Sequence, residues 1–181
     1  GDPMSAGGKK YRVGMIGCGL MATNHATAYA ANPMTEIVAA ADPDAENLDR
    51  LCRRFGVPAR YSSYEEMLEK ERIDIAAPVL PVGVNPDAVV ACARAGVRAI
   101  FCEKPMADSL GAAREMLIKV ATNDVKLVIG HQRRFLPAYT LARQMIEDGE
   151  VGDVQLITSI AGDGLPNYAT HQTDMFRYLL G

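Results

Sequence analysis

The chain has 181 residues, of which 49% are hydrophobic and 23% charged, and its formal net charge is −3. This size and composition suit one complete α/β domain plus part of a second. Acidic and basic residues are mixed along the sequence, so no basic stripe indicates nucleic-acid binding. The apolar runs are far shorter than the roughly 18–20 residues that span a bilayer, and no leader pattern is recognised. We therefore expect a cytoplasmic protein with no membrane or nucleic-acid partner.

In chain order, short apolar runs alternate with helical segments between residues 11 and 130. Ser63 begins a capping box, whereas Asp42-Pro43 and Asn85-Pro86 each predict an N-cap followed by proline at the first helical position. Strands are predicted over 11–16, 36–41, 73–77, 97–102 and 125–130, and helices over 21–31, 43–55, 86–96 and 109–121, with a further short helix after Ser63. This α/β alternation predicts a doubly wound parallel sheet, a Rossmann domain over 9–130.

The alternation stops after Gly130. The remaining pattern predicts a helix over 136–148, one strand over 154–161 and a helix over 168–180. A single strand between two helices cannot bury both faces of a sheet, so residues 131–181 are predicted to be an incomplete α+β second domain. The unpaired strand edge invites pairing with another chain, which predicts a homo-oligomer.

The four cysteines, at positions 18, 52, 92 and 102, are spaced as neither a zinc site nor a redox pair. We therefore predict no metal site and interpret these residues as reduced thiols that pack in the core.

A glycine-rich turn follows the first predicted strand and opens the first helix. Gly17 permits the tight turn, and Gly19 lacks a side chain, so a pyrophosphate can approach the backbone. The helix N-terminus offers N–H groups and a partial positive charge to the phosphates. The alternative is a glycine turn kept for packing alone. The predicted cofactor contacts in this turn are Gly17, Cys18, Gly19, Leu20 and Met21.

Asp42 follows the second predicted strand, where a carboxylate accepts hydrogen bonds from the adenosine ribose. A carboxylate there repels a 2′-phosphate, which favours NAD over NADP. Asp42 also fits as a plain helix cap, and the two roles are compatible.

The tripeptide Glu103-Lys104-Pro105 ends a predicted buried strand and follows the run from Ala95 to Cys102. This segment resembles the AGKHVLCEKP signature of the Gfo/Idh/MocA oxidoreductases, the relatives of glucose–fructose oxidoreductase and inositol dehydrogenase. Further segments that resemble the family are 13–19, 40–43, 61–68, 134–137, 149–152 and 170–174.

The resemblance implies a nicotinamide-dependent dehydrogenase that moves a hydride between C4 of the nicotinamide and a carbon of a sugar, polyol or related compound. By this resemblance, Lys104 lies beside the nicotinamide and holds or polarises the reacting oxygen, while Glu103 and the loop 78–84 line the nicotinamide end. His171 would act as general acid or base, because an imidazole exchanges protons near neutral pH. Asp174, at i+3 on the same helix, would bind substrate hydroxyls.

Two departures from the family pattern concern the substrate site. Asn167 stands where the family often has aspartate, four residues before the histidine. Asparagine can orient the substrate or His171 but cannot take up a proton. The segment Asn85-Pro86 stands where the common form has histidine, after a loop that is longer than usual, so the rim of the site is expected to differ.

Each candidate also has a structural interpretation. Lys104 could be a surface charge, His171 an ordinary helix residue and Asp174 a solvated or capping acid. The arginines at 133 and 134 are interpreted as structural, and the histidines at 25 and 131 receive no clear role. His25 could touch the cofactor, but a position on the helix surface is favoured.

Three hypotheses follow for the whole chain. The first is an NAD-dependent dehydrogenase, the second a dinucleotide-binding module without turnover, and the third a structural subunit with a relict fingerprint. Family members are about twice as long, so the chain is either a piece of a longer protein, a natural fragment completed by oligomerisation, or a half-enzyme that only binds.

Overall fold

The structure is a computed structural model that describes residues 10–160 and 165–181. The chain divides into two compact units, the first ending at Ile129 and the second beginning at Gly130. Within the described ranges, no helix combines the length and the apolar character needed to cross a membrane.

The first unit is built on a six-stranded parallel sheet with the strand order β3-β2-β1-β4-β5-β6. Its strands are β1 (Tyr11–Ile16), β2 (Thr35–Ala41), β3 (Ala59–Tyr61), β4 (Ile75–Pro78), β5 (Ala99–Cys102) and β6 (Lys126–Ile129). The chain order reverses between the central strands β1 and β4, where doubly wound sheets open a crevice at their carboxyl ends. The predicted Rossmann fold is confirmed. Strand β3 was missed because three residues are too few to show a periodicity.

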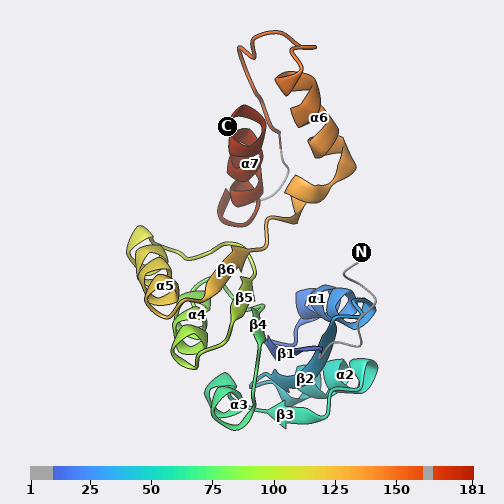
Figure 1. Cartoon of the computed structure of the whole chain (residues 1–181), viewed down its shortest axis with the longest axis vertical. Helices are drawn as coiled ribbons and strands as arrows, with labels where there is room; N and C mark the ends of the chain where they lie inside the picture. The colour runs from blue at the N-terminus through green and yellow to red at the C-terminus, as the bar shows by residue number, and fades with distance from the viewer. Residues whose placement is uncertain (1–9, 161–164) are drawn as a thin grey trace, which may run out of the picture. The chain divides into compact units, whose positions relative to one another are not determined.

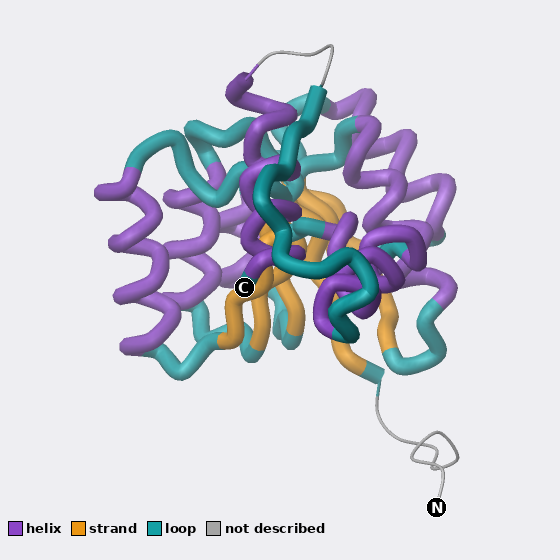
Figure 2. The backbone as a smooth tube through the Cα atoms, turned by 90° about the horizontal axis from the view of Figure 1, so that it is seen from above, coloured by secondary structure: helices purple, strands orange, loops and turns teal. Residues whose placement is uncertain are grey.

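The five helices of the first unit cover the two faces of this sheet. Figure 1 labels these helices beside the strands, and Figure 2 gives a second view. One face packs against α1 (Leu20–Ala31) and α2 (Ala45–Phe55), and the other against α3 (Tyr64–Lys70), α4 (Asn85–Arg94) and α5 (Leu110–Thr122). Because both faces are covered, the strands consist of apolar runs rather than alternating polar and apolar residues.

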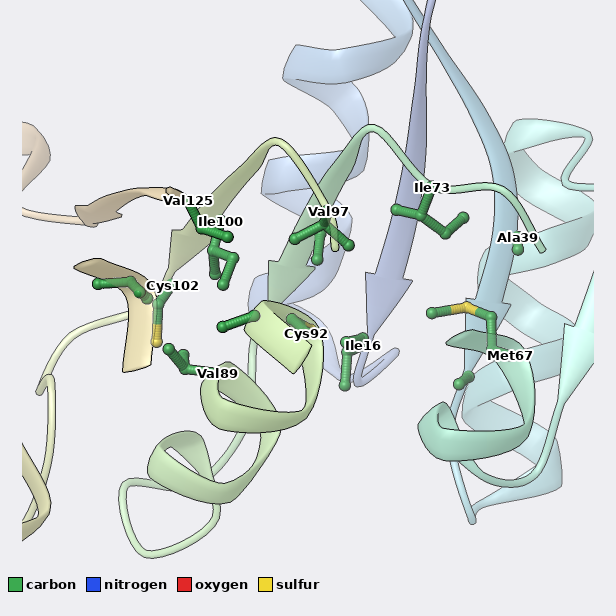
Figure 3. Packing of buried hydrophobic residues seen from close by; sticks show 14 of the residues in the cluster. Ile16, Ala39, Met67, Ile73, Val89, Cys92, Val97, Ile100, Cys102 and Val125 are labelled. Atoms are coloured by element: carbon green, nitrogen blue, oxygen red, sulfur yellow. The ribbon is translucent and has the colours of Figure 1, made fainter. Parts of the chain in front are cut away.

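The core on the α3–α5 face is made of aliphatic and sulfur-containing side chains (Figure 3). Cys92 on α4 and Cys102 on β5 belong to it, while Cys18 and Cys52 are buried on the opposite face. All four cysteines are free buried thiols, as predicted. Burial raises the pKa of Cys102 to about 12, so this thiol stays protonated at neutral pH and acts as an apolar packing group.

Two predicted helix starts are wrong. Helix α2 is capped by Asp44, whose carboxylate accepts from the N–H groups of Glu46 and Asn47, and not by Asp42. Helix α4 is preceded by Val84, so Asn85 lies inside the helix and is buried. In both places a tertiary contact engages the side chain that the local pattern assigned to the cap. The serine cap predicted for α3 is confirmed.

The second unit contains the 3₁₀ helix η1 (Gln132–Phe135) and helices α6 (Pro137–Glu147) and α7 (Leu165–Leu180). Both predicted helices are confirmed, with an earlier start for α7. The predicted strand is wrong over 154–160, which has no regular secondary structure, and Ala161 lies outside the described residues. A strand requires a partner for its N–H and C=O groups, and no described segment pairs with this one.

Candidate functional site

The glycine turn between β1 and α1 lies at the crevice of the sheet. Gly17 has a φ of +86°, and its N–H donates to the carbonyl of Ala41 at 2.8 Å. A Cβ on Gly17 would stand 2.4 Å from the carbonyl oxygen of Val79, in the loop after β4. Real Cβ atoms do not approach so closely, so the meeting of these two loops requires glycine at this position.

Gly19 is the N-cap of α1, and no side chain caps the helix. A Cβ placed on Gly19 would meet no protein atom within 4 Å, so open space adjoins the helix N-terminus. Leu20 and Met21, which follow it, are exposed. The first N–H groups of a helix have no partner inside the helix, and they carry a partial positive charge. The turn therefore fits the pyrophosphate of a dinucleotide.

Asp42 fixes the shape of this turn. Its Oδ2 accepts from the N–H of Cys18 at 2.6 Å, and its Oδ1 accepts from the N–H of Asp44 at 2.8 Å. A carboxylate oxygen can accept more than one hydrogen bond, so these contacts leave acceptor capacity for a ribose hydroxyl. The Cys18 thiol is buried, and burial first, then the charge of Asp42, raises its pKa to about 12. Cys18 therefore contributes its backbone to the turn.

Glu103 and Lys104 directly follow β5 at the same carboxyl edge of the sheet. The N–H of Glu103 donates to the carbonyl of Pro78 at 2.9 Å, and Glu103 Oε2 accepts from the N–H of Lys104 at 2.9 Å. Glu103 is buried, Lys104 is half-buried, and the Lys104–Pro105 peptide bond is cis. The structure thus brings the predicted residues of the turn and of this tripeptide to one edge of the first unit.

Two residues that hold this tripeptide were missed in the sequence. His25 Nε2 lies 3.0 Å from Glu103 Oε1, so the predicted helix-surface position of His25 is wrong. Its place on the face of α1 that carries Ala22 and Ala26 could have signalled contact with the sheet. The amide nitrogen of Asn85 donates to the carbonyls of Glu103 at 3.3 Å and Pro105 at 3.2 Å.

The predicted residues of the second unit contact other residues of that unit. His171 is buried on α7, and its ring lies edge-on to His131 with 5.9 Å between centroids. The guanidinium of Arg134 donates from Nε to both oxygens of Asp174, at 3.0 and 2.9 Å, and from Nη2 to Oδ1 at 2.6 Å. Arg134 also stacks over Tyr178 at 5.5 Å. The side chain of Asn167 lies outside the described residues.

The charges around Asp174 set its protonation. Burial raises its pKa, but the hydrogen bonds of Arg134 and the electrostatic effects of His131, Arg134 and His171 outweigh burial, and the pKa lies below its ordinary value. Asp174 is therefore a carboxylate at neutral pH, and the Arg134 contact is the structural role that the sequence favoured for that arginine.

Replacing Arg134 with glutamine should raise the pKa of Asp174, because the largest stabilising contact of the carboxylate is removed. NMR titration of the Asp174 carboxyl carbon measures this shift. Unfolding free energy should fall by about 1 kcal/mol at pH 7, since the guanidinium is partly exposed. A group with a depressed folded pKa stabilises above its unfolded pKa of about 3.9, so this loss should shrink as the pH falls through the folded pKa. Arg177→Gln, an exposed change on α7, is the control, and an unchanged Asp174 titration in R134Q would contradict the expectation.

The sequence profile of a family described as "Oxidoreductase family, NAD-binding Rossmann fold" (GFO_IDH_MocA) matches residues 11–131. The chain belongs to the Gfo/Idh/MocA family. The matched range contains all six strands of the first unit, the glycine turn and the Glu103-Lys104-Pro105 segment.

Individual members of the family resemble the chain along most of its length. It is 31% identical over 147 residues to the trans-1,2-dihydrobenzene-1,2-diol dehydrogenase of Mus musculus, covering 80% of the chain and 44% of that protein. It is 29% identical over 184 aligned residues to the inositol 2-dehydrogenase of Rhizobium meliloti (strain 1021), covering 94% and 55%. The WlbA dehydrogenase from Bordetella pertussis, solved with NADH and UDP-GlcNAcA, matches with a TM-score of 0.85 and 25% identity, covering 96% and 59%. The chain thus spans about half the length of these Gfo/Idh/MocA relatives.

Proposed function

We propose that the chain carries the cofactor site and the proton-transfer residues of an NAD-dependent dehydrogenase that acts on a sugar, a polyol or a related hydroxylated compound. The observation that carries this proposal is the glycine turn in the crevice, where Gly17 is sterically required and Gly19 borders open space. Inositol and dihydrodiol dehydrogenases among the relatives support the substrate class.

The residues divide the work along the carboxyl edge of the sheet. The backbone from Gly17 to Met21 holds the pyrophosphate, and Asp42 holds the adenosine ribose and selects NAD over NADP by charge repulsion. Glu103 and Lys104 form the nicotinamide end, where bound NAD supplies the acceptor for a hydride.

The residues proposed to act on the substrate lie on helix α7 of the second unit. In this proposal His171 moves a proton at the reacting hydroxyl oxygen, and Asp174 accepts hydrogen bonds from substrate hydroxyls. Asn167 orients the substrate or the histidine, since an amide cannot take up the proton.

Titration with NADH, followed by the emission of the nicotinamide, tests the cofactor site. The sequence has no tryptophan, so the cofactor itself must report. Gly19→Asp should weaken binding at least about tenfold, because a carboxylate at the helix N-terminus occupies the phosphate position and repels it. Gly19→Ala is the matched control, and both variants should remain folded, since a Cβ meets nothing there. Failure of the folded wild-type chain to bind NADH would refute the proposal.

A binding module without turnover is the second candidate. It is favoured by the Arg134–Asp174 contact, which occupies both oxygens of the carboxylate assigned to substrate. Reduction of NAD in the presence of a panel of polyols distinguishes the two candidates: turnover above the rate without polyol supports the enzyme, and saturable NADH binding with no turnover supports the module.

We further propose a cytoplasmic location and a homo-oligomer. Four free buried thiols suit a reducing compartment. Leu156 and Ile160 are almost fully exposed, in a segment whose backbone pairs with no strand among the described residues, and a second copy could cover them. Sedimentation equilibrium of the purified chain tests the oligomer, and a monomer at all concentrations would refute it.

A further inference from the structure

One buried contact joins the cofactor helix to the tripeptide after β5. His25 lies on α1, six residues beyond Gly19, and its Nε2 is 3.0 Å from Glu103 Oε1. The two side chains are only 9% and 10% exposed. The ring of His25 also packs against Phe101 of β5, with 5.3 Å between ring centroids. The contact is therefore shielded from water and held in place by packing as well as by the hydrogen bond.

The same carboxylate also holds the backbone of Lys104. While Oε1 faces His25, Oε2 accepts from the N–H of Lys104 at 2.9 Å. The N–H of Glu103 is fixed in turn by the carbonyl of Pro78 at the end of β4. A continuous series of hydrogen bonds thus runs from His25 on α1 through the Glu103 side chain to the backbone of Lys104. The backbone of Glu103 is itself bound to β4 of the central sheet.

A buried carboxylate is costly unless its oxygens are satisfied, and apolar side chains of similar size often stabilise a core at least as well. Stability alone therefore does not account for a polar pair at this position. The pair instead fixes the position of one residue relative to a helix. It connects α1, whose N-terminus receives the pyrophosphate in the proposed function, to Lys104, which faces the nicotinamide there.

We propose that His25 is a positioning residue, which through Glu103 holds Lys104 at a set place relative to the cofactor helix. The inference rests on the proposed function, since it assigns the pyrophosphate to α1 and the nicotinamide end to Lys104. It predicts that His25 matters for the nicotinamide half of the dinucleotide and not for the adenosine half.

Comparison of NADH with ADP-ribose, which lacks the nicotinamide ring, tests this assignment. His25→Ala should weaken NADH binding about tenfold, the scale expected for losing a hydrogen bond to a charged group, and should leave the affinity for ADP-ribose unchanged. His25→Gln places an amide nitrogen near the position of Nε2 and should restore most of the NADH affinity. Asn24→Ala, an exposed change on the same helix, should alter neither affinity. Equal weakening of both nucleotides, or no weakening of NADH, would overturn the proposal.

Hydrogen exchange separates this inference from the cofactor assignment. The backbone N–H of Lys104 should exchange at least about tenfold faster in His25→Ala than in wild type, and close to the wild-type rate in His25→Gln, because its acceptor is released in the first variant only. If wild type binds neither nucleotide, the proposed function fails, and the Lys104 exchange rate alone then decides whether His25 positions the turn. An unchanged rate in the alanine variant overturns the inference.

Discussion

Replacing Gly17 with alanine is expected to lower the unfolding free energy by about 3 kcal/mol or more and to remove NADH binding. Two effects add at this position. The φ of +86° disfavours any side chain by about 1–2 kcal/mol, and the new Cβ stands 2.4 Å from the backbone oxygen of Val79. A backbone oxygen cannot rotate away as a side chain can, so the loops after β1 and β4 must separate. Urea unfolding followed by circular dichroism measures the loss.

Gly96→Ala is the matched control for this experiment. Gly96 also has a positive φ, of +76°, but a Cβ there would meet nothing within 4 Å. Its cost should be the conformational part alone, about 1–2 kcal/mol. An equal loss in the two variants would show that the contact with Val79 relaxes freely and would contradict the steric requirement.

The first unit was largely predictable from the sequence because its signals are local. Apolar strands, helix caps and the glycine turn alternate with a regular spacing, and a parallel sheet follows from that alternation. The helix caps at Asp42 and Asn85 were predicted wrongly because the contacts of these two side chains are not local. Asp42 is engaged by the N–H of Cys18, and Asn85 by carbonyls about twenty residues away, so their roles depend on contacts that no local pattern reports.

The residues of the candidate site likewise include some that local motifs predict and some that only distant contacts reveal. The glycine turn was predicted as a cofactor site from a contiguous motif, and the segment Glu103-Lys104 from its resemblance to a contiguous family signature. Both assignments stay predictions. His25 was assigned to the helix surface because its partner Glu103 is 78 residues away, and only the packing of α1 on the sheet brings the two together. The segment 154–160 was predicted as a strand from its apolar pattern, but a pattern alone cannot supply the neighbouring strand.

The side chain of Asn85 contacts its neighbours through the hydrogen-bond donors of its amide group. Its Nδ2 holds two carbonyls, of Glu103 and Pro105, whereas its Oδ1 is buried with no hydrogen-bond partner among the described residues. An aspartate at this position would have the same shape, but it would turn an oxygen toward both carbonyls. The identity of the side chain at 85 is therefore set by the tripeptide that it holds.

Asn85→Asp should lower the unfolding free energy by about 3 kcal/mol or more at pH 7.5, because two hydrogen bonds become repulsive contacts and a charge is buried. Burial raises the folded pKa of such an aspartate above its unfolded value of about 3.9, so the deficit relative to wild type should grow as the pH rises through that range and be smaller at pH 5. Asn85→Ala, which removes the donors without adding a charge, should lose about 2 kcal/mol equally at both pH values. Urea unfolding of the three proteins at pH 5 and 7.5 measures these differences. If the loss of unfolding free energy in N85D does not change with pH, the new carboxylate is in contact with water. That result would contradict the expectation that Asn85 holds the Glu103–Pro105 segment through two buried hydrogen bonds.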